Sequence, residues 1–262
     1  MAWFQIDEEK RLYYKTEGEG KDTIIFVNGL AMSTSGWKNQ IEFFKKDYRM
    51  VSYDQRCQGL SYKMESRFHY TLLVEDLLNL MDYLAIDSAH IVGISYGTVV
   101  SKEFAIRHPE RCKKLVLIVP PRKPDFTFKM FLKHCNSLLE KNQLEDFYDF
   151  IFYLSFNRPF SDSLESDYPA MMEGNKRILT AKSMQNLLNS VNWETDLDNY
   201  PLLKTETLVL SASHDNLNNP AAGPRIAGEA KTARFKLITG GHAINYDNPD
   251  EINQEIKKFL QG

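Results

Sequence analysis

The chain has 262 residues, of which 43% are apolar and 26% are charged, and its net charge at pH 7 is -3. A chain of this length can bury a sizeable core, either as one large α/β domain or as a core domain with a subdomain. The charge balance gives no electrostatic footprint for nucleic acid or for an anionic membrane, so we expect neither as a partner.

Strand-like and helix-like segments alternate along most of the chain. Two short aromatic segments at its start predict a hairpin of edge strands, and six apolar runs predict strands that are buried on both faces. These six runs are 23–28, 49–54, 89–94, 114–119, 207–212 and 234–239, and helical segments are predicted at 37–46, 71–86, 96–108 and 249–261. The alternation predicts an α/β fold in which helices cover both faces of a mostly parallel sheet.

One region interrupts this alternation. Residues 121–203 contain no strand-like run and carry many Phe, Tyr and Met residues in a helical pattern. We therefore divide the chain into a core, residues 1–120 and 204–262, and an inserted helical cap or lid subdomain, residues 121–203. Any single aromatic residue here serves helix packing more often than ligand binding, but such insertions tend to lie over the carboxyl ends of the strands, where ligands bind.

Ser95 is the first candidate for chemistry. It lies in the sequence Gly-Ile-Ser-Tyr-Gly, residues 93–97, between a predicted buried strand and a predicted helix. This is the setting of a nucleophile elbow, a tight turn that exposes the serine hydroxyl. Gly93 and Gly97 are then required because side chains there would collide with the crossing backbone. The alternative is an ordinary strand-to-helix turn with a helix-capping serine.

A serine nucleophile needs a base, and the base needs an orienting acid. His242 follows the last predicted strand, and Asp215 follows the strand before it. The chain order Ser95, Asp215, His242 is the order expected of a nucleophile, an acid and a base in this arrangement. Asp125, which follows an earlier strand, is the alternative acid.

An anionic tetrahedral intermediate needs two N–H donors. The amide of Tyr96 follows the nucleophile directly, and the amide of Leu30 lies in the loop after the strand at 23–28. We expect these two amides to form the oxyanion hole and Asn28 and Gly29 to lie beside the substrate. The alternative is that the Asn-Gly pair simply makes a turn.

These motifs resemble those of the α/β-hydrolase fold superfamily over essentially the whole chain. The resemblance is carried by residues 27–37, 52–61, 90–100, 208–215 and 240–252. It implies an eight-stranded, mostly parallel sheet with an inserted helical cap, a triad of Ser95, Asp215 and His242, and an oxyanion hole formed by the Leu30 and Tyr96 amides. It implies no metal and no organic cofactor.

The sequence departs from the usual family pattern at several positions. Asn28 replaces the usual His of the oxyanion loop, which makes this loop similar to that of β-ketoadipate enol-lactonases. Cys57 replaces a glycine of the Asp-x-Arg-Gly-x-Gly-x-Ser loop, so we expect its φ angle to be negative. Epoxide hydrolases and haloalkane dehalogenases use Asp at the elbow, where this chain has Ser95, and the resemblance therefore disfavours them.

The sequence predicts a serine esterase or lactonase that cleaves a carboxylic ester or lactone through an acyl-enzyme. The aromatic, Met-rich insertion favours a small-molecule substrate with an apolar part. Carbon–carbon bond hydrolysis, amide or thioester hydrolysis, perhydrolysis and acyl transfer use the same triad and stay open. A non-catalytic small-molecule receptor with this fold is the alternative from another class.

Cysteine usage and hydropathy predict the compartment. The three cysteines, Cys57, Cys112 and Cys135, form no disulfide framework and no metal-binding pattern, which favours a reducing compartment. The first residues lack the apolar core of a secretory signal, and no segment is long enough to span a bilayer. We expect a cytoplasmic, soluble protein.

Overall fold

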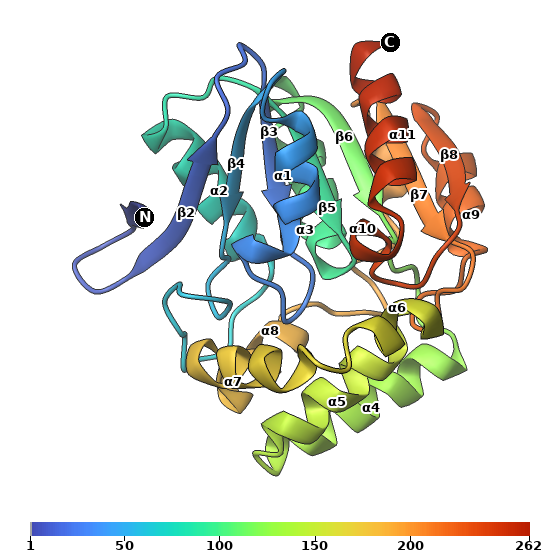
Figure 1. The fold of residues 1–262 in the computed structure, drawn as a ribbon. Helices are drawn as coiled ribbons and strands as arrows, with labels where there is room; N and C mark the ends of the chain where they lie inside the picture. Colours follow the sequence, from blue (N-terminus) through green and yellow to red (C-terminus); the bar gives the residue numbers. More distant parts are fainter. Residues whose placement is uncertain (1) are drawn as a thin grey trace.

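A computed structural model describes residues 2–262, and its centre is an eight-stranded sheet (Figure 1). The strand order is β1-β2-β4-β3-β5-β6-β7-β8. The strands are β1 Ala2–Gln5, β2 Arg11–Glu17, β3 Thr23–Val27, β4 Arg49–Tyr53, β5 Ala89–Ile94, β6 Cys112–Ile118, β7 Thr207–Ala212 and β8 Ala233–Ile238. Only the β1–β2 and β2–β4 pairs are antiparallel among the described strands, which confirms the predicted hairpin and the mostly parallel sheet.

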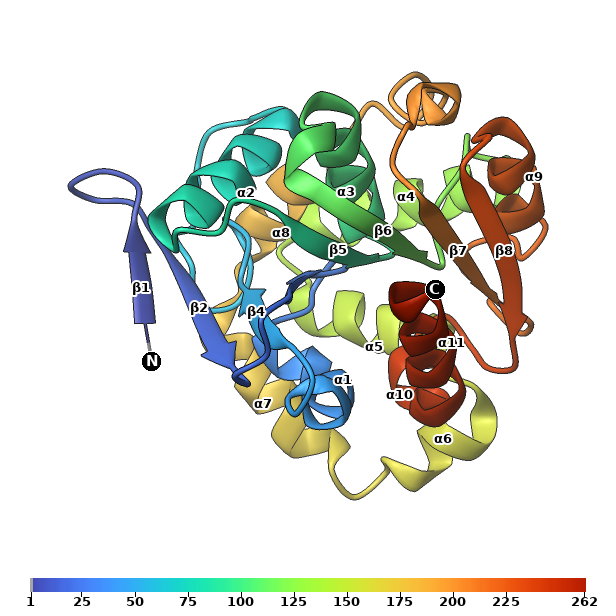
Figure 2. The same cartoon turned by 90° about the horizontal axis from the view of Figure 1, so that it is seen from above.

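Helices cover both faces of the sheet, as Figure 2 shows from above. One face is covered by α2 Thr71–Tyr83, α3 Tyr96–Arg107 and α9 Ala222–Glu229, and the other by α1 Lys38–Phe44 and α11 Pro249–Gln261. In β3 the buried side chains alternate, so that Ile25 and Val27 pack in one core and Ile24 and Phe26 in the other. This period-2 alternation in a wholly apolar strand is what a sheet buried between two helical layers requires.

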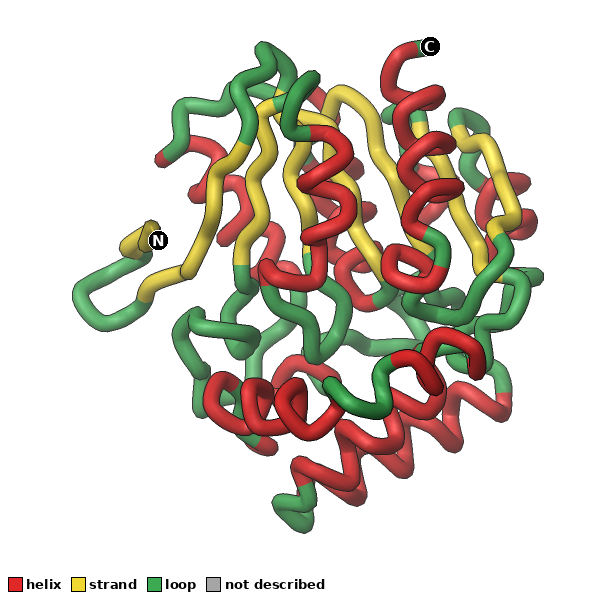
Figure 3. Tube along the Cα trace, in the orientation of Figure 1, coloured by secondary structure: helices red, strands yellow, loops and turns green. Residues whose placement is uncertain are grey.

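Five further helices lie between β6 and β7, beyond one end of the sheet (Figure 1). They are α4 Phe126–Glu140, α5 Leu144–Ser155, α6 Arg158–Ser163, α7 Tyr168–Ile178 and α8 Ala181–Leu188. Figure 3 shows this layer as helices and loops, and the structure describes no strand between β6 and β7. The layer therefore stands apart from the alternating pattern of the rest of the chain.

Two elements of the sheet region differ from the sequence expectation. β8 is an edge strand with β7 as its neighbour, and it is not buried on both faces, since Phe235 and Leu237 are 36% and 47% exposed. α9 is not predicted by its glycine-containing sequence. Gly223 lets this helix approach β7 closely, because a Cβ there would lie 2.3 Å from Ser211 Oγ.

The expectation for Cys57 was wrong, because its φ is +69°. The Cys57 amide donates to Tyr62 O at 2.8 Å, and its buried sulfur accepts from the Met64 amide at 3.4 Å. These two bonds hold a non-glycine residue in the left-handed region that the turn requires.

Within residues 2–262, no helix is both long and apolar enough to cross a membrane.

Candidate active site

Ser95 occupies the turn between β5 and α3 with φ 50° and ψ -120°. Such a conformation is strained for a serine and persists only where the surroundings enforce it. A Cβ built on Gly97 would lie 2.3 Å from Val27 O, and one on Gly93 would lie 2.4 Å from Ser101 Oγ. A Cβ on Gly93 would also lie 2.8 Å from Gly97 O, so side chains at both positions would collide with backbone, as expected from the sequence.

The structure brings Ser95, His242 and Asp215 together. Ser95 Oγ lies 2.8 Å from His242 Nε2, and His242 Nδ1 lies 2.8 Å from Asp215 Oδ2. Since a carboxylate only accepts, Nδ1 carries the imidazole proton and Nε2 is left to accept from the serine hydroxyl. The arrangement can therefore remove a proton from Ser95.

The carboxylate of Asp215 is held in place by its own loop. Its Oδ1 accepts from the amides of Leu217 and Asn218, both at 2.8 Å, which leaves Oδ2 for the histidine. The alternative acid, Asp125, has another partner: its side chain caps α4 by accepting from the Phe128 amide at 2.9 Å. The structure thus pairs His242 with Asp215.

The loop that carries His242 is bonded on both sides of the histidine. Before it, the Gly241 amide donates to Asp247 Oδ2 at 2.7 Å, and after it the Ala243 amide donates to Ser155 O at 2.8 Å. The same Asp247 oxygen accepts from Asn157 Nδ2 at 2.9 Å. The α5–α6 junction is therefore attached directly to the histidine loop. No sequence signal pointed to Asp247, because its partner Asn157 is distant in the chain.

Two glutamines set the orientation of the loop after β3. Gln55 Nε2 donates to Asn28 O at 2.9 Å, and Gln58 Nε2 donates to Gly29 O at 2.7 Å. Because the C=O and N–H of a trans peptide point in opposite directions, the second bond turns the Leu30 N–H away from Gln58. Leu30 lines the cavity and the fully buried Gln58 does not. The Tyr96 amide is the first of α3 and so has no intrahelical acceptor.

Asn28 does not lie beside the cavity, contrary to the sequence expectation, whereas Gly29 does line it. The Asn28 side chain is fully buried behind the loop. It accepts from Trp37 Nε1 at 2.8 Å and donates to Tyr53 O at 3.0 Å. A buried amide with both ends paired in this way fixes the loop to the core.

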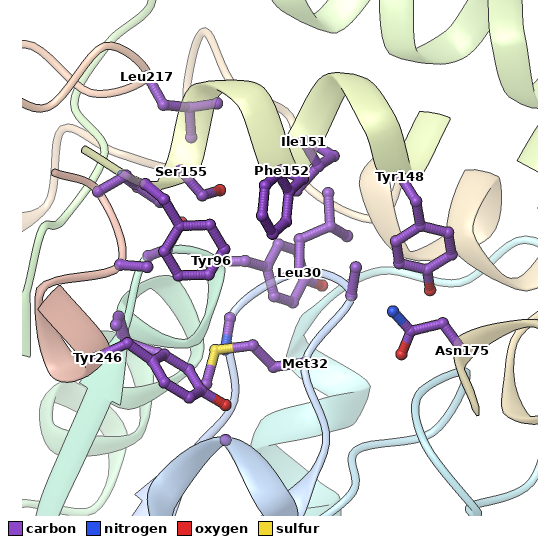
Figure 4. Close-up of a pocket in the computed structure, with 18 of the residues that line it drawn as sticks. Leu30, Met32, Tyr96, Tyr148, Ile151, Phe152, Ser155, Asn175, Leu217 and Tyr246 are labelled. Atoms are coloured by element: carbon purple, nitrogen blue, oxygen red, sulfur yellow. The ribbon is translucent and has the colours of Figure 1, made fainter. Parts of the chain in front are cut away.

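A cavity of about 440 Å³ opens above Ser95, between the strand loops and helices α4, α5 and α7 (Figure 4). Its lining is mainly aromatic and aliphatic, and within residues 2–262 it includes no Asp, Glu, Lys or Arg. Met32, Phe152 and Tyr246 are among the apolar side chains that Figure 4 shows around it. The described residues contain no group of three or more His, Cys, Asp or Glu side chains that could hold a metal ion.

Comparison with known proteins assigns most of the chain to one family. Residues 22–249 match the family described as alpha/beta hydrolase fold. The crystal structure of MGS-M2, an alpha/beta hydrolase enzyme from a Medee basin deep-sea metagenome library, is 28% identical with a TM-score of 0.89, over 100% of this chain and 98% of that one. The structure of the enol-lactonase from Burkholderia xenovorans LB400 has a TM-score of 0.86 at 23% identity, over 100% of both chains, which shows a shared fold.

Two sequence relatives also span nearly the whole chain. A Caulobacter vibrioides protein with the provisional name carbamate hydrolase RutD is 25% identical over 96% of this chain and 96% of its own length. The 3-oxoadipate enol-lactonase 2 of Acinetobacter baylyi is 23% identical over 97% of this chain and 94% of its own length.

Proposed function

Because this chain belongs to the alpha/beta hydrolase fold family, we propose that it is a serine hydrolase that cleaves carboxylic esters or lactones with a mainly apolar body. The observation that carries the proposal is the pair of 2.8 Å hydrogen bonds that links Ser95 through His242 to Asp215 beneath an apolar cavity. A hydroxyl, an imidazole and a carboxylate in this order are the components of acyl transfer.

In the first half of the proposed reaction, His242 Nε2 accepts the proton of Ser95 as Oγ attacks the carbonyl carbon. Asp215 stabilises the imidazolium that forms. The carbonyl oxygen becomes an oxyanion, which accepts hydrogen bonds from the amides of Leu30 and Tyr96. The orientation imposed by Gln58 on the Leu30 peptide supports this role.

In the second half, the tetrahedral intermediate collapses and His242 gives its proton to the alcohol oxygen, which leaves. A water molecule then attacks the acyl-enzyme while His242 accepts its proton. Collapse of the second intermediate releases the carboxylic acid and returns the proton to Ser95. For a lactone the alcohol stays attached to the acyl chain, so ring opening gives a single hydroxy acid.

In this proposed enzyme, residues 121–203 form a cap subdomain, and residues 1–120 and 204–262 form the core that carries the triad. The cavity supports this division, because its lining combines strand loops of the core with α4, α5 and α7. Asn28 is assigned to positioning the oxyanion loop. The likeness to an enol-lactonase supports including lactones among the substrates. Oxoadipate, however, is by its name a carboxylate, and the described cavity has no Lys or Arg in its lining to pair with one. The proposed substrates are therefore uncharged.

Labelling with a fluorophosphonate probe, followed by a screen of p-nitrophenyl esters and lactones, tests the proposal. We expect native protein to be labelled, and Ser95→Ala to lose labelling and roughly 10⁴- to 10⁶-fold in kcat. Ser66→Ala is the matched control, because Ser66 is exposed on a loop. Native protein that takes no label and hydrolyses nothing, yet binds a small molecule in the cavity, would identify a receptor in place of an enzyme.

A further inference from the structure

One face of α5 runs along the cavity. Tyr148, Ile151, Phe152 and Ser155 all line it, and their spacing of three, four and seven residues places them on one side of the helix. Figure 4 shows these four side chains in order along the helix. The cavity therefore has a long axis that follows α5.

The bond between Ser155 O and the Ala243 amide fixes which end of this axis is the reaction centre, because Ala243 is next to His242. Tyr148 comes seven residues before Ser155 in the helix. At about 1.5 Å per residue, Tyr148 lies roughly 10 Å further along the axis. Figure 4 shows Tyr148 on the opposite side of the view from Tyr96 and Tyr246.

The Tyr148 hydroxyl lies at this far end without a hydrogen-bond partner among the described residues, although the residue is only 5% exposed. Most buried hydroxyls are paired, so an unpaired one needs an explanation. Figure 4 shows the hydroxyl directed toward Asn175 of α7, which also lines the cavity. Burial raises the pKa of Tyr148, so the group stays a neutral donor. A neutral donor beside an amide, in a cavity whose described lining includes no Asp, Glu, Lys or Arg, suits an uncharged oxygen.

We propose that Tyr148 and Asn175 form a polar subsite for an uncharged carbonyl, ether or hydroxyl oxygen at the far end of the substrate. An extended chain advances roughly 1.2 Å per bond, so roughly 10 Å corresponds to about eight bonds from the scissile carbonyl. The inference rests on the proposed function and deepens it, because it names the substrate class: a medium-chain, uncharged ester or lactone that carries one distal oxygen.

Paired p-nitrophenyl esters test the subsite. Octanoate is compared with 7-oxooctanoate and decanoate with 9-oxodecanoate, because each pair differs only in a keto oxygen, which lies seven or nine bonds from the ester carbonyl carbon, on either side of eight. We expect native protein to prefer at least one oxo ester by roughly tenfold in kcat/KM, the size of one hydrogen bond. Tyr148→Phe should abolish the preference by raising KM for that oxo ester, with little change for its unsubstituted partner.

Tyr153→Phe is the matched control, because Tyr153 lies on the same helix but is 74% exposed, and it should keep the preference. Tyr148→Phe should unfold at the same temperature as native protein or higher, since the hydroxyl that it removes has no partner in the protein. Native protein that hydrolyses both members of each pair with equal kcat/KM, or Tyr148→Phe that retains the preference, would overturn the subsite.

A binding measurement separates failure of the subsite from failure of the proposed function. Calorimetry follows the binding of methyl esters to two proteins, Ser95→Ala and the double variant that also carries Tyr148→Phe. The ligands are methyl 7-oxooctanoate, methyl 9-oxodecanoate and the corresponding unsubstituted methyl esters. The subsite is supported if Ser95→Ala binds an oxo ester more tightly than its unsubstituted partner and the double variant does not. This result would support the subsite even if native protein hydrolyses nothing. Hydrolysis of plain and oxo esters at equal rates, with equal binding, leaves the hydrolase proposal standing and removes the subsite.

Discussion

The left-handed backbone of Cys57 makes a quantitative prediction about glycine and alanine at that position. At an ordinary buried site alanine is more stable than glycine, by about 0.8 kcal/mol for the buried methyl group and about 0.4–1 kcal/mol for the lower entropy of the unfolded chain. At Cys57 the φ of +69° adds a cost of about 1–2 kcal/mol for any residue with a Cβ. The two contributions nearly cancel, so Cys57→Gly and Cys57→Ala should have unfolding free energies within about 1 kcal/mol of each other.

Cys112 provides the matched control, because it is also buried but has φ -112°. Cys112→Ala should be more stable than Cys112→Gly by about 1.2–1.8 kcal/mol. Urea unfolding of all four variants gives the Ala–Gly difference in unfolding free energy at each position. Subtracting the difference at Cys57 from the difference at Cys112 measures the backbone strain at Cys57. We expect about 1–2 kcal/mol. Equal Gly–Ala gaps at the two positions would refute the argument that Cys57 is strained.

Two further predictions concern pH and the histidine loop. Burial lowers the pKa of His90 from 6.5 to about 4, so its contribution to the free energy of unfolding is complete above pH 6.5 and falls as the pH drops toward 4. After discounting for solvent screening, we expect urea unfolding to show a loss of about 1–2 kcal/mol over this range. An unchanged pH dependence in His90→Gln would contradict this. Asp247→Ala should lower the unfolding free energy by about 2–5 kcal/mol by leaving the Gly241 and Asn157 donors unpaired, and should also lower kcat. Asp247→Asn, which keeps an acceptor, should be milder; equal losses in both variants would show that the charge matters more than the hydrogen bonds.

The parallel sheet and the juxtaposition of Ser95, Asp215 and His242 could be predicted because each depends on a local pattern. Strand runs are short and apolar, and carboxyl ends of parallel strands meet at one edge of the sheet. Three residues that follow three strands are therefore brought together by topology alone. The distances and the hydrogen-bond partners of Asp215 come from loop conformations, which the pattern does not specify.

The remaining features depend on contacts between distant parts of the chain. Asn28 was expected beside the substrate, but Trp37 and Tyr53 hold its side chain in the core. The φ of Cys57 follows from bonds to Tyr62 and Met64, not from its residue type. Which aromatic residues of 121–203 face the cavity depends on how each helix is rotated, and a Phe-rich helix offers more than one apolar face.

The attachment of α5 to the histidine loop has a consequence for how substrates reach Ser95. Moving the C-terminal end of α5, at Ser155, would break the hydrogen bond from the Ala243 amide and disturb the neighbouring His242. By contrast, α6 has no buried residue and α7 has one, Met172, so displacing these two helices exposes few buried side chains. We therefore expect the route to lie across residues 158–178, with their amides exchanging hydrogen faster than those of α5. Local opening of these two helices would admit substrate while the catalytic hydrogen bonds stay intact.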